Sequence, residues 1–140
     1  MLIVAAAGNN GPGAAPSYPA AYPGVIAVTA VDRNLAIYSR ATQGEYIDIA
    51  APGGGGIARS GTSYAVPFIS AAAAILRASD ALPDAASVQT TLEGRTLDLG
   101  KPGRDRTFGF GLLQAANLCQ PHQDETPVAQ SATGPGIEVP

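Results

Sequence analysis

Residues 53–67 read GGGGIARSGTSYAVP, a glycine run that leads into an apolar segment typical of a helix. The stretch allows three interpretations: a phosphate-binding loop, a flexible connector, or the seat of a nucleophile. Gly56 and Gly61 have the spacing of a nucleotide P-loop, but Thr62 and Ser63 follow, so the lysine that would neutralise the phosphates is missing. The phosphate interpretation is therefore disfavoured, and for the four glycines alone a flexible connector is favoured.

Ser63 stands at the expected start of that helix. Free backbone N–H groups and the helix dipole stabilise negative charge there, which favours an alkoxide or an oxyanion. The alternative is that Thr62 or Ser63 only caps the helix, and position alone favours the cap. Pro67 fits a simple capped helix poorly, because it falls after the first turn and its missing N–H leaves an upstream carbonyl unpaired.

Around this stretch the sequence predicts an α/β fold with a parallel sheet flanked by helices. The expected strands are continuously apolar or nearly so, which is typical of strands covered on both faces, and they span residues 2–6, 25–31 and 46–50. The expected helices span residues 62–79, 83–93 and 112–119. The first helix is apolar or small nearly all round, so we expect it to be buried on every side.

The chain is expected to form one domain with a tail. Residues 1–119 carry the predicted elements, whereas residues 120–140 have no periodicity and four prolines, which indicates a disordered tail or linker. The sequence begins at Met1 already inside an apolar strand. This pattern predicts a sheet that is incomplete at its N-terminal side, as in the second part of a larger domain.

The composition argues against several classes of function. The 140 residues carry 8 Lys and Arg against 11 Asp and Glu, and this net charge of −3 makes a nucleic-acid partner unexpected. Cys119 is the single cysteine, so no internal disulfide can form. The apolar run at residues 65–76 is too short for a membrane span, and the opening MLIVAAAG lacks the basic region of a signal peptide.

Several segments together resemble one family. GTSYAVP at residues 61–67 has the pattern of a nucleophile motif, and four further segments accompany it: VAAAGN at 4–9, YPAAYPGVIAV at 18–28, IDIAAPG at 47–53 and FGFGLLQA at 108–115. In this order they resemble the subtilisin-like serine peptidases (subtilases). The resemblance covers residues 2–118 and implies the C-terminal part of the family's catalytic domain.

The resemblance implies roles for six residues. Ser63 would be the acyl-forming nucleophile, and Asn9 would hold the tetrahedral oxyanion together with the Ser63 backbone N–H. Asn9 alone, in GNNG, has the pattern of a turn residue, but the order and company of the motifs favour the catalytic role. The substrate pocket implied by the resemblance is small and uncharged, which favours an apolar side chain, and it would be lined by Ala6, Ala7, Gly8 and Ser17.

The resemblance requires no cofactor, but it raises the question of a cation. Asp48 and the carbonyls of Ala20, Tyr22 and Val25 match positions that bind a cation in some members, so a structural Ca²⁺ or monovalent cation is one interpretation. The acidic residue expected two places before Asp48 is Tyr46 here. The other interpretation is that Asp48 is a satisfied carboxylate at a strand end.

The match lacks two members of the catalytic triad. The chain's single histidine is His122, in the expected tail, and the family's histidine and aspartate motifs would precede Met1. The link from residue 53 to Gly61 is also shorter than usual. The prediction is a serine endopeptidase that acts on peptides or proteins, secreted or periplasmic by family, whose partner is a missing N-terminal half. The chain alone is expected to be inactive. The alternative is an inactive remnant or an interaction module.

Overall fold

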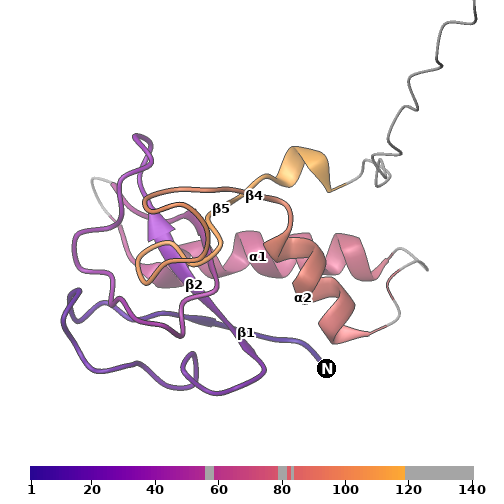
Figure 1. Ribbon diagram of the computed structural model, residues 1–140, viewed down its shortest axis with the longest axis horizontal. Helices are drawn as coiled ribbons and strands as arrows, with labels where there is room; N and C mark the ends of the chain where they lie inside the picture. The colour runs from indigo at the N-terminus through magenta and orange to yellow at the C-terminus, as the bar shows by residue number, and fades with distance from the viewer. Residues whose placement is uncertain (56–58, 79–81, 83, 119–140) are drawn as a thin grey trace, which may run out of the picture.

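A five-stranded sheet forms the centre of the protein (Figure 1). The computed structural model describes residues 1–55, 59–78, 82 and 84–118. The strands lie in the order β1-β2-β3-β5-β4, and neighbouring strands are parallel except β4 and β5. Their bounds are β1 Ile3–Ala6, β2 Val25–Val31, β3 Ile49–Pro52, β4 Thr96–Leu97 and β5 Leu112–Leu113. The predicted α/β fold with a mainly parallel sheet is confirmed.

Strand β2, which lies between β1 and β3, belongs to the core. All seven of its residues are buried, as its apolar sequence VIAVTAV predicts. It pairs with β1 on one side, where Ile3 lies opposite Val25, and with β3 on the other, where Val28 lies opposite Ile49. Within the described residues, β1 has a strand neighbour on one side only.

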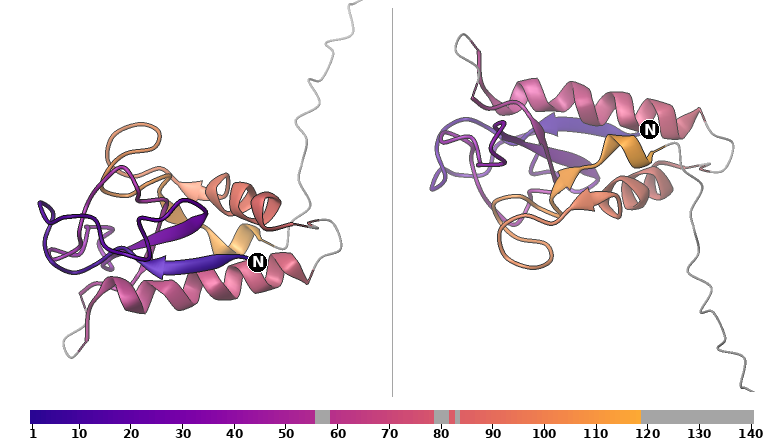
Figure 2. Two further views of the ribbon diagram at one scale, coloured as in Figure 1. Left: turned by 90° about the horizontal axis from the view of Figure 1, so that it is seen from below. Right: turned by 90° about the horizontal axis from the view of Figure 1, so that it is seen from above.

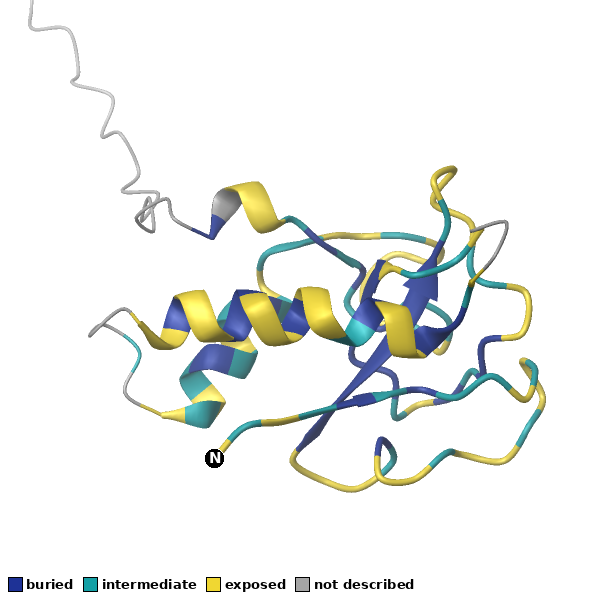
Figure 3. Ribbon diagram, turned by 180° about the vertical axis from the view of Figure 1, so that it is seen from behind, coloured by how far each residue is buried: buried dark blue, intermediate teal, exposed yellow. Residues whose placement is uncertain are grey.

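Helix α1, Thr62–Arg77, lies along the sheet and contacts β1, β2 and β3 (Figure 2). One face of the helix is buried, with Ala65, Ile69 and Leu76 packed in the main core. The expectation that this helix is buried on every side is wrong, because its outer face is exposed (Figure 3). Tyr64, Phe68 and Ile75 follow the spacing of one helix face and are 45%, 52% and 49% exposed.

Helix α2, Ala85–Glu93, packs against α1 and brings Val88 and Leu92 into the same core. Asp84 caps it, because its side chain accepts the Ser87 N–H at 2.7 Å. Neither helix in the described part of the chain has the length and apolar character to cross a bilayer.

Two predicted elements differ from the structure by more than two residues or in type. The third strand begins at Ile49 and not at Tyr46, because residues 44–47 form a turn in which the Ile47 N–H bonds to the Gly44 carbonyl at 3.1 Å. The helix expected from residue 112 is replaced by β5 and a short 3-10 helix, η1, at Ala115–Asn117. Gly109 and Gly111 adopt positive φ of 62° and 117° just before β5, and this backbone path pairs Leu112 with Ala50. Cys119, His122 and the expected tail lie outside the described residues.

Candidate active site

The start of α1 meets the carboxyl ends of two strands. Asn9 lies just beyond β1, and Gly53 immediately follows β3. The Gly61 N–H donates to the Gly53 carbonyl at 2.9 Å, which ties the residue before α1 to the end of β3. Carboxyl ends of parallel strands share one edge of a sheet, which is where α/β proteins commonly place their sites.

Gly53 and Gly54 are packed and hydrogen-bonded. Their N–H groups both donate to the Val31 carbonyl, at 3.1 and 3.0 Å. A Cβ on Gly53 would lie 2.9 Å from the Ala65 nitrogen and 2.9 Å from the Gly61 carbonyl oxygen, so only glycine fits between β3 and α1. The flexible-connector interpretation is therefore wrong for these two glycines. Gly56 lies outside the described residues.

Asn9 caps α1 from outside the helix. Its Oδ1 accepts the Thr62 N–H at 2.9 Å and the Thr62 hydroxyl at 3.1 Å, and Thr62 Oγ1 accepts the Gly8 N–H at 3.2 Å. The N-cap residue of α1 is Gly61, which has no side chain, so neither Thr62 nor Ser63 acts as the cap. Because Oδ1 faces the helix start, the Nδ2 group is left as the donor of the Asn9 carboxamide.

Ser63 is the second residue of α1 and is exposed. Its backbone N–H belongs to the first turn, whose N–H groups have no partner within the helix. Pro67 lies four residues further on in the same helix, so the Ser63 carbonyl also lacks its usual intrahelical donor. The described residues contain no histidine, because His122 lies beyond them, so they place no imidazole beside Ser63.

The four residues expected to form a substrate pocket are a contacting pair, Gly8 and Ser17, and two alanines at the end of β1. Gly8 and Ser17 are in contact, since the Ser17 hydroxyl fills the space where a Gly8 Cβ would stand, and Gly8 has φ of +109°. Ala6 is half-buried, but Ala7 is fully buried and contributes backbone rather than a methyl surface. The Ala7 carbonyl accepts the Tyr46 hydroxyl at 2.6 Å. Burial raises the pKa of Tyr46, which keeps this donor protonated.

Asp48 lies at the opposite, amino edge of the sheet, just before β3. Its Oδ2 accepts the Ala27 N–H at 2.8 Å, and its Oδ1 accepts from Arg104 Nη2 at 3.0 Å. Burial raises the pKa of this carboxyl, and these two partners act against the rise. Within the described ranges, no three Asp, Glu, His or Cys side chains are grouped closely enough to hold a metal ion.

The sequence reasoning missed three residues that shape these two edges: Thr62, Tyr46 and Arg104. Thr62 was treated as a candidate cap, whereas its buried hydroxyl bridges Gly8 and Asn9. The GTS motif was the available signal for Thr62. No local pattern signals Arg104, because its hydrogen-bond partners lie 56 or more positions away.

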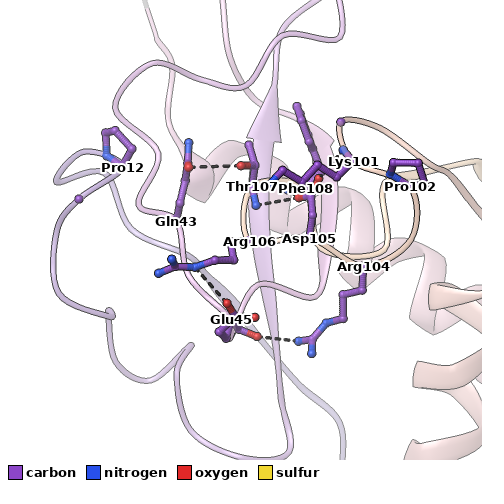
Figure 4. Close-up of a pocket in the computed structure, with 12 residues that line it drawn as sticks. Pro12, Gln43, Glu45, Lys101, Pro102, Arg104, Asp105, Arg106, Thr107 and Phe108 are labelled. Carbon is purple, nitrogen blue, oxygen red and sulfur yellow. Dashed lines mark hydrogen bonds and ion pairs between the residues drawn. The ribbon is translucent and has the colours of Figure 1, made fainter.

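A cavity of about 770 Å³ lies between the loop after Asn9, residues 43–45 and the loop 100–108 (Figure 4). Charged side chains line it, and two of them pair with each other, Arg106 Nε and a Glu45 carboxylate oxygen at 3.1 Å. The Thr107 hydroxyl donates to Gln43 Oε1 at 3.2 Å across the same space. The cavity is therefore polar and was not expected from the sequence.

Comparison with known proteins identifies the family. The model of the subtilase family (peptidase S8) matches residues 1–111. The chain belongs to the subtilase family. Among the relatives of this subtilase, the minor extracellular protease Epr of Bacillus subtilis is 36% identical over 123 residues, which are 81% of this chain and 19% of Epr. Subtilisin Savinase of Lederbergia lenta is 34% identical over 124 residues, 82% of this chain and 45% of Savinase.

A solved structure supports the fold. A lanthipeptide protease matches with a TM-score of 0.73 at 23% identity, over 84% of this subtilase and 50% of that chain. This subtilase therefore spans about half or less of the length of these three proteins. The resemblance found in the motifs is confirmed, and the family is one of serine peptidases.

Proposed function

We propose that Ser63 is the nucleophile of a serine endopeptidase and that Asn9 binds the oxyanion. The observation that carries this proposal is the pair of hydrogen bonds from Thr62 to Asn9 Oδ1, at 2.9 and 3.1 Å, because they fix the carboxamide next to Ser63. The Asn9 Nδ2 group and the Ser63 N–H are proposed as the two donors to the oxyanion.

The chemistry proposed is acyl transfer. Ser63 Oγ attacks the carbonyl carbon of a peptide bond while a general base takes the hydroxyl proton, and the carbonyl oxygen becomes an oxyanion that the two donors stabilise. The leaving amine takes the proton, and water then hydrolyses the acyl-enzyme. These steps need no cofactor.

The proposed substrates are peptides or proteins. Gly8 and Ser17 would line the pocket for the side chain before the scissile bond, with Ala6 and the backbone of Ala7 as its wall. Because this wall is small and uncharged, an apolar side chain is proposed. Since the relative Epr is an extracellular protease, secretion or export to the periplasm is proposed for this protein.

The general base and the carboxylate that orients it are proposed to come from a partner, the N-terminal half of a subtilase domain. A surface suited to this partner lies where β1 has an open side and the outer face of α1 is exposed. A cavity of about 370 Å³ between β1 and α1 adjoins it, lined by residues that include Leu2, Val4 and Ala73. A strand of the partner would form backbone hydrogen bonds with the open side of β1, and an apolar element of the partner would cover Phe68 and Ile75. The chain alone is proposed to be inactive.

A fluorophosphonate probe, which labels activated serines, tests the proposal. The 140-residue chain is exposed to the probe alone and after refolding with the N-terminal half of a subtilase domain. We expect labelling only in the mixture, lost in Ser63→Ala and kept in Ser39→Ala, an exposed serine in the loop after β2. Absence of Ser63-dependent labelling in a mixture that forms a complex would overturn the peptidase proposal and favour the interaction module.

A further inference from the structure

A second, smaller cavity, at the amino edge of the sheet, is where the resemblance to the subtilases implies a cation. It has a volume of about 220 Å³ and is lined by residues 20–25, Tyr46, Asp48, Gln89 and Arg104. Hard cations take oxygen ligands, so the Asp48 carboxylate would have to supply one. One oxygen accepts the Ala27 N–H, and the other is paired with Arg104, whose positive charge neutralises the carboxylate and would lie beside any ion bound there. The residues present therefore do not fit a metal ion.

The Arg104 guanidinium sits among oxygens as a bound cation would. Its Nη2 lies 2.9 Å from the Glu45 carbonyl, 3.1 Å from the Ile47 carbonyl and 3.0 Å from Asp48 Oδ1. Figure 4 shows the side chain reaching from its loop toward Glu45. One nitrogen of the positively charged guanidinium thus has three oxygen contacts, supplied by three residues of the segment 45–48.

The loop and an aromatic ring hold the guanidinium in this position. Arg104 Cζ lies 5.4 Å from the centroid of the Phe110 ring, within range of a cation–π contact. The Phe110 N–H donates to the Asp48 carbonyl at 2.8 Å, so the backbone that carries the ring is held beside the backbone that carries the carboxylate. The loop is closed by the Gly103 N–H, which donates to Asp98 Oδ2 at 2.7 Å.

We propose that Arg104 takes the place of the cation in this chain, so that the Asp48 site binds no metal ion while the guanidinium is present. A divalent ion entering the cavity would meet a fixed positive charge and a carboxylate that is already paired. Removal of the Arg104 side chain leaves the Asp48 carboxylate and the two carbonyls as oxygen ligands, and so opens a cation site. This inference does not depend on the peptidase proposal.

Tb³⁺, a luminescent ion that binds the same kinds of oxygen ligand as Ca²⁺, tests the proposal directly. Tyr22 and Tyr46 line the cavity and would sensitise the emission of a bound ion. We expect no saturable emission from the unaltered chain, saturable emission from Arg104→Ala, and its loss in the double variant Arg104→Ala/Asp48→Asn. Saturable emission from the unaltered chain that Asp48→Asn removes would overturn the proposal, as would no emission from folded Arg104→Ala.

Thermal unfolding supplies the second measurement, with Arg106→Ala as the matched control. Arg106 belongs to the same loop and pairs with Glu45, but the two side chains are 69% and 83% exposed, respectively. Loss of the Arg106 side chain is therefore expected to leave Tm unchanged. Arg104→Ala is expected to lower Tm by about 5 °C and to regain most of it in CaCl₂, whereas the unaltered chain does not respond to CaCl₂ or EDTA. If Arg104→Ala fails to fold, Arg104→Lys should fold without added cation and Arg104→Gln only with it. Equal folding of both without cation would overturn the proposal.

Discussion

The two edges of the sheet position their polar side chains in different ways. At the carboxyl edge, Asn9 and the start of α1 are held by backbone groups, by a fully buried threonine and by a glycine with no room for a methyl group. At the amino edge, Asp48 is held by the Ala27 backbone N–H and by the side chain of Arg104, which comes from a distant loop and is 41% exposed. The position of Ser63 is therefore set by the backbone and by buried groups, whereas the amino edge also depends on one long, partly exposed side chain that a substitution can remove.

The largest effect is expected at Asn9. If Asn9 Nδ2 stabilises the oxyanion, Asn9→Ala should lower turnover of the assembled enzyme by about 10²–10³-fold, the size measured for a donor of this kind in a member of this family. The loss should appear in kcat more than in KM, because the contact forms in the transition state. Asn10→Ala is the control, since Asn10 is exposed and bonds Thr42 through its backbone. If Asn9→Ala left turnover unchanged, Asn9 would not be the oxyanion donor, and the carboxyl edge would lack the proposed function.

Gly53→Ala should have the largest effect on stability. The added methyl would meet backbone atoms at 2.9 Å that cannot rotate away, so we expect a loss of about 2–3 kcal/mol in the free energy of unfolding. Gly13→Ala is the control, because a Cβ there meets nothing within 4 Å. Urea denaturation of the three proteins measures the difference. Equal midpoints for the two variants would show that the β3–α1 junction is not close-packed.

Two buried threonines allow the effect of hydrogen bonding on stability to be distinguished from the effect of burial. Thr62 and Thr29 are both fully buried, but Thr62 Oγ1 has two hydrogen-bond partners, whereas Thr29 Oγ1 has none in the described part of the chain. Thr62→Val should cost about 1–2 kcal/mol, because it leaves the Gly8 N–H without an acceptor. Thr29→Val should be neutral or stabilising, because it removes an unsatisfied hydroxyl. A larger loss for Thr29→Val in thermal unfolding would contradict this assignment.

Local patterns in the sequence predicted most of the carboxyl edge. The apolar run of β2 and the start of α1 at Thr62 are local signals, and the structure has them at the predicted residues. The strand at Ile3 and the helix ending at Glu93 differ from prediction by one or two residues at their starts. The motif order placed Asn9 and Ser63 together, and the structure has them at one helix start. Their catalytic roles stay predictions.

The rest could not be predicted because it depends on contacts between distant residues. Small residues such as Ala71 and Ala74 fit a buried and an exposed helix face equally well, so the exposed side of α1 was missed. Leu112 and Leu113 have helical as well as strand character, and their pairing with β3 and β4 decides the outcome. The ion pair of Asp48 with Arg104 joins residues 56 positions apart.

The smallest expected effect is a pH dependence of the loop that carries Arg104. The Asp105 carboxylate accepts the N–H groups of Phe108 and Thr107 at 2.8 Å each and of Lys101 at 3.0 Å. Desolvation raises the pKa of this carboxyl, but the three hydrogen bonds outweigh it, so its pKa in the folded protein lies below the ordinary 3.8.

A carboxyl whose pKa is lowered on folding stabilises the protein above its unfolded pKa, and this contribution is lost as the pH falls through the folded value. We therefore expect Asp105→Asn to lower the free energy of unfolding by about 1 kcal/mol at pH 7, a modest loss because Asp105 is partly exposed. At pH 3 the loss should be smaller, because the carboxylate is then partly protonated. Urea midpoints of the two proteins at both pH values measure this. A difference that does not shrink with falling pH would assign the effect to shape and not to charge. The loop at the amino edge would then be held by backbone packing, as the carboxyl edge is.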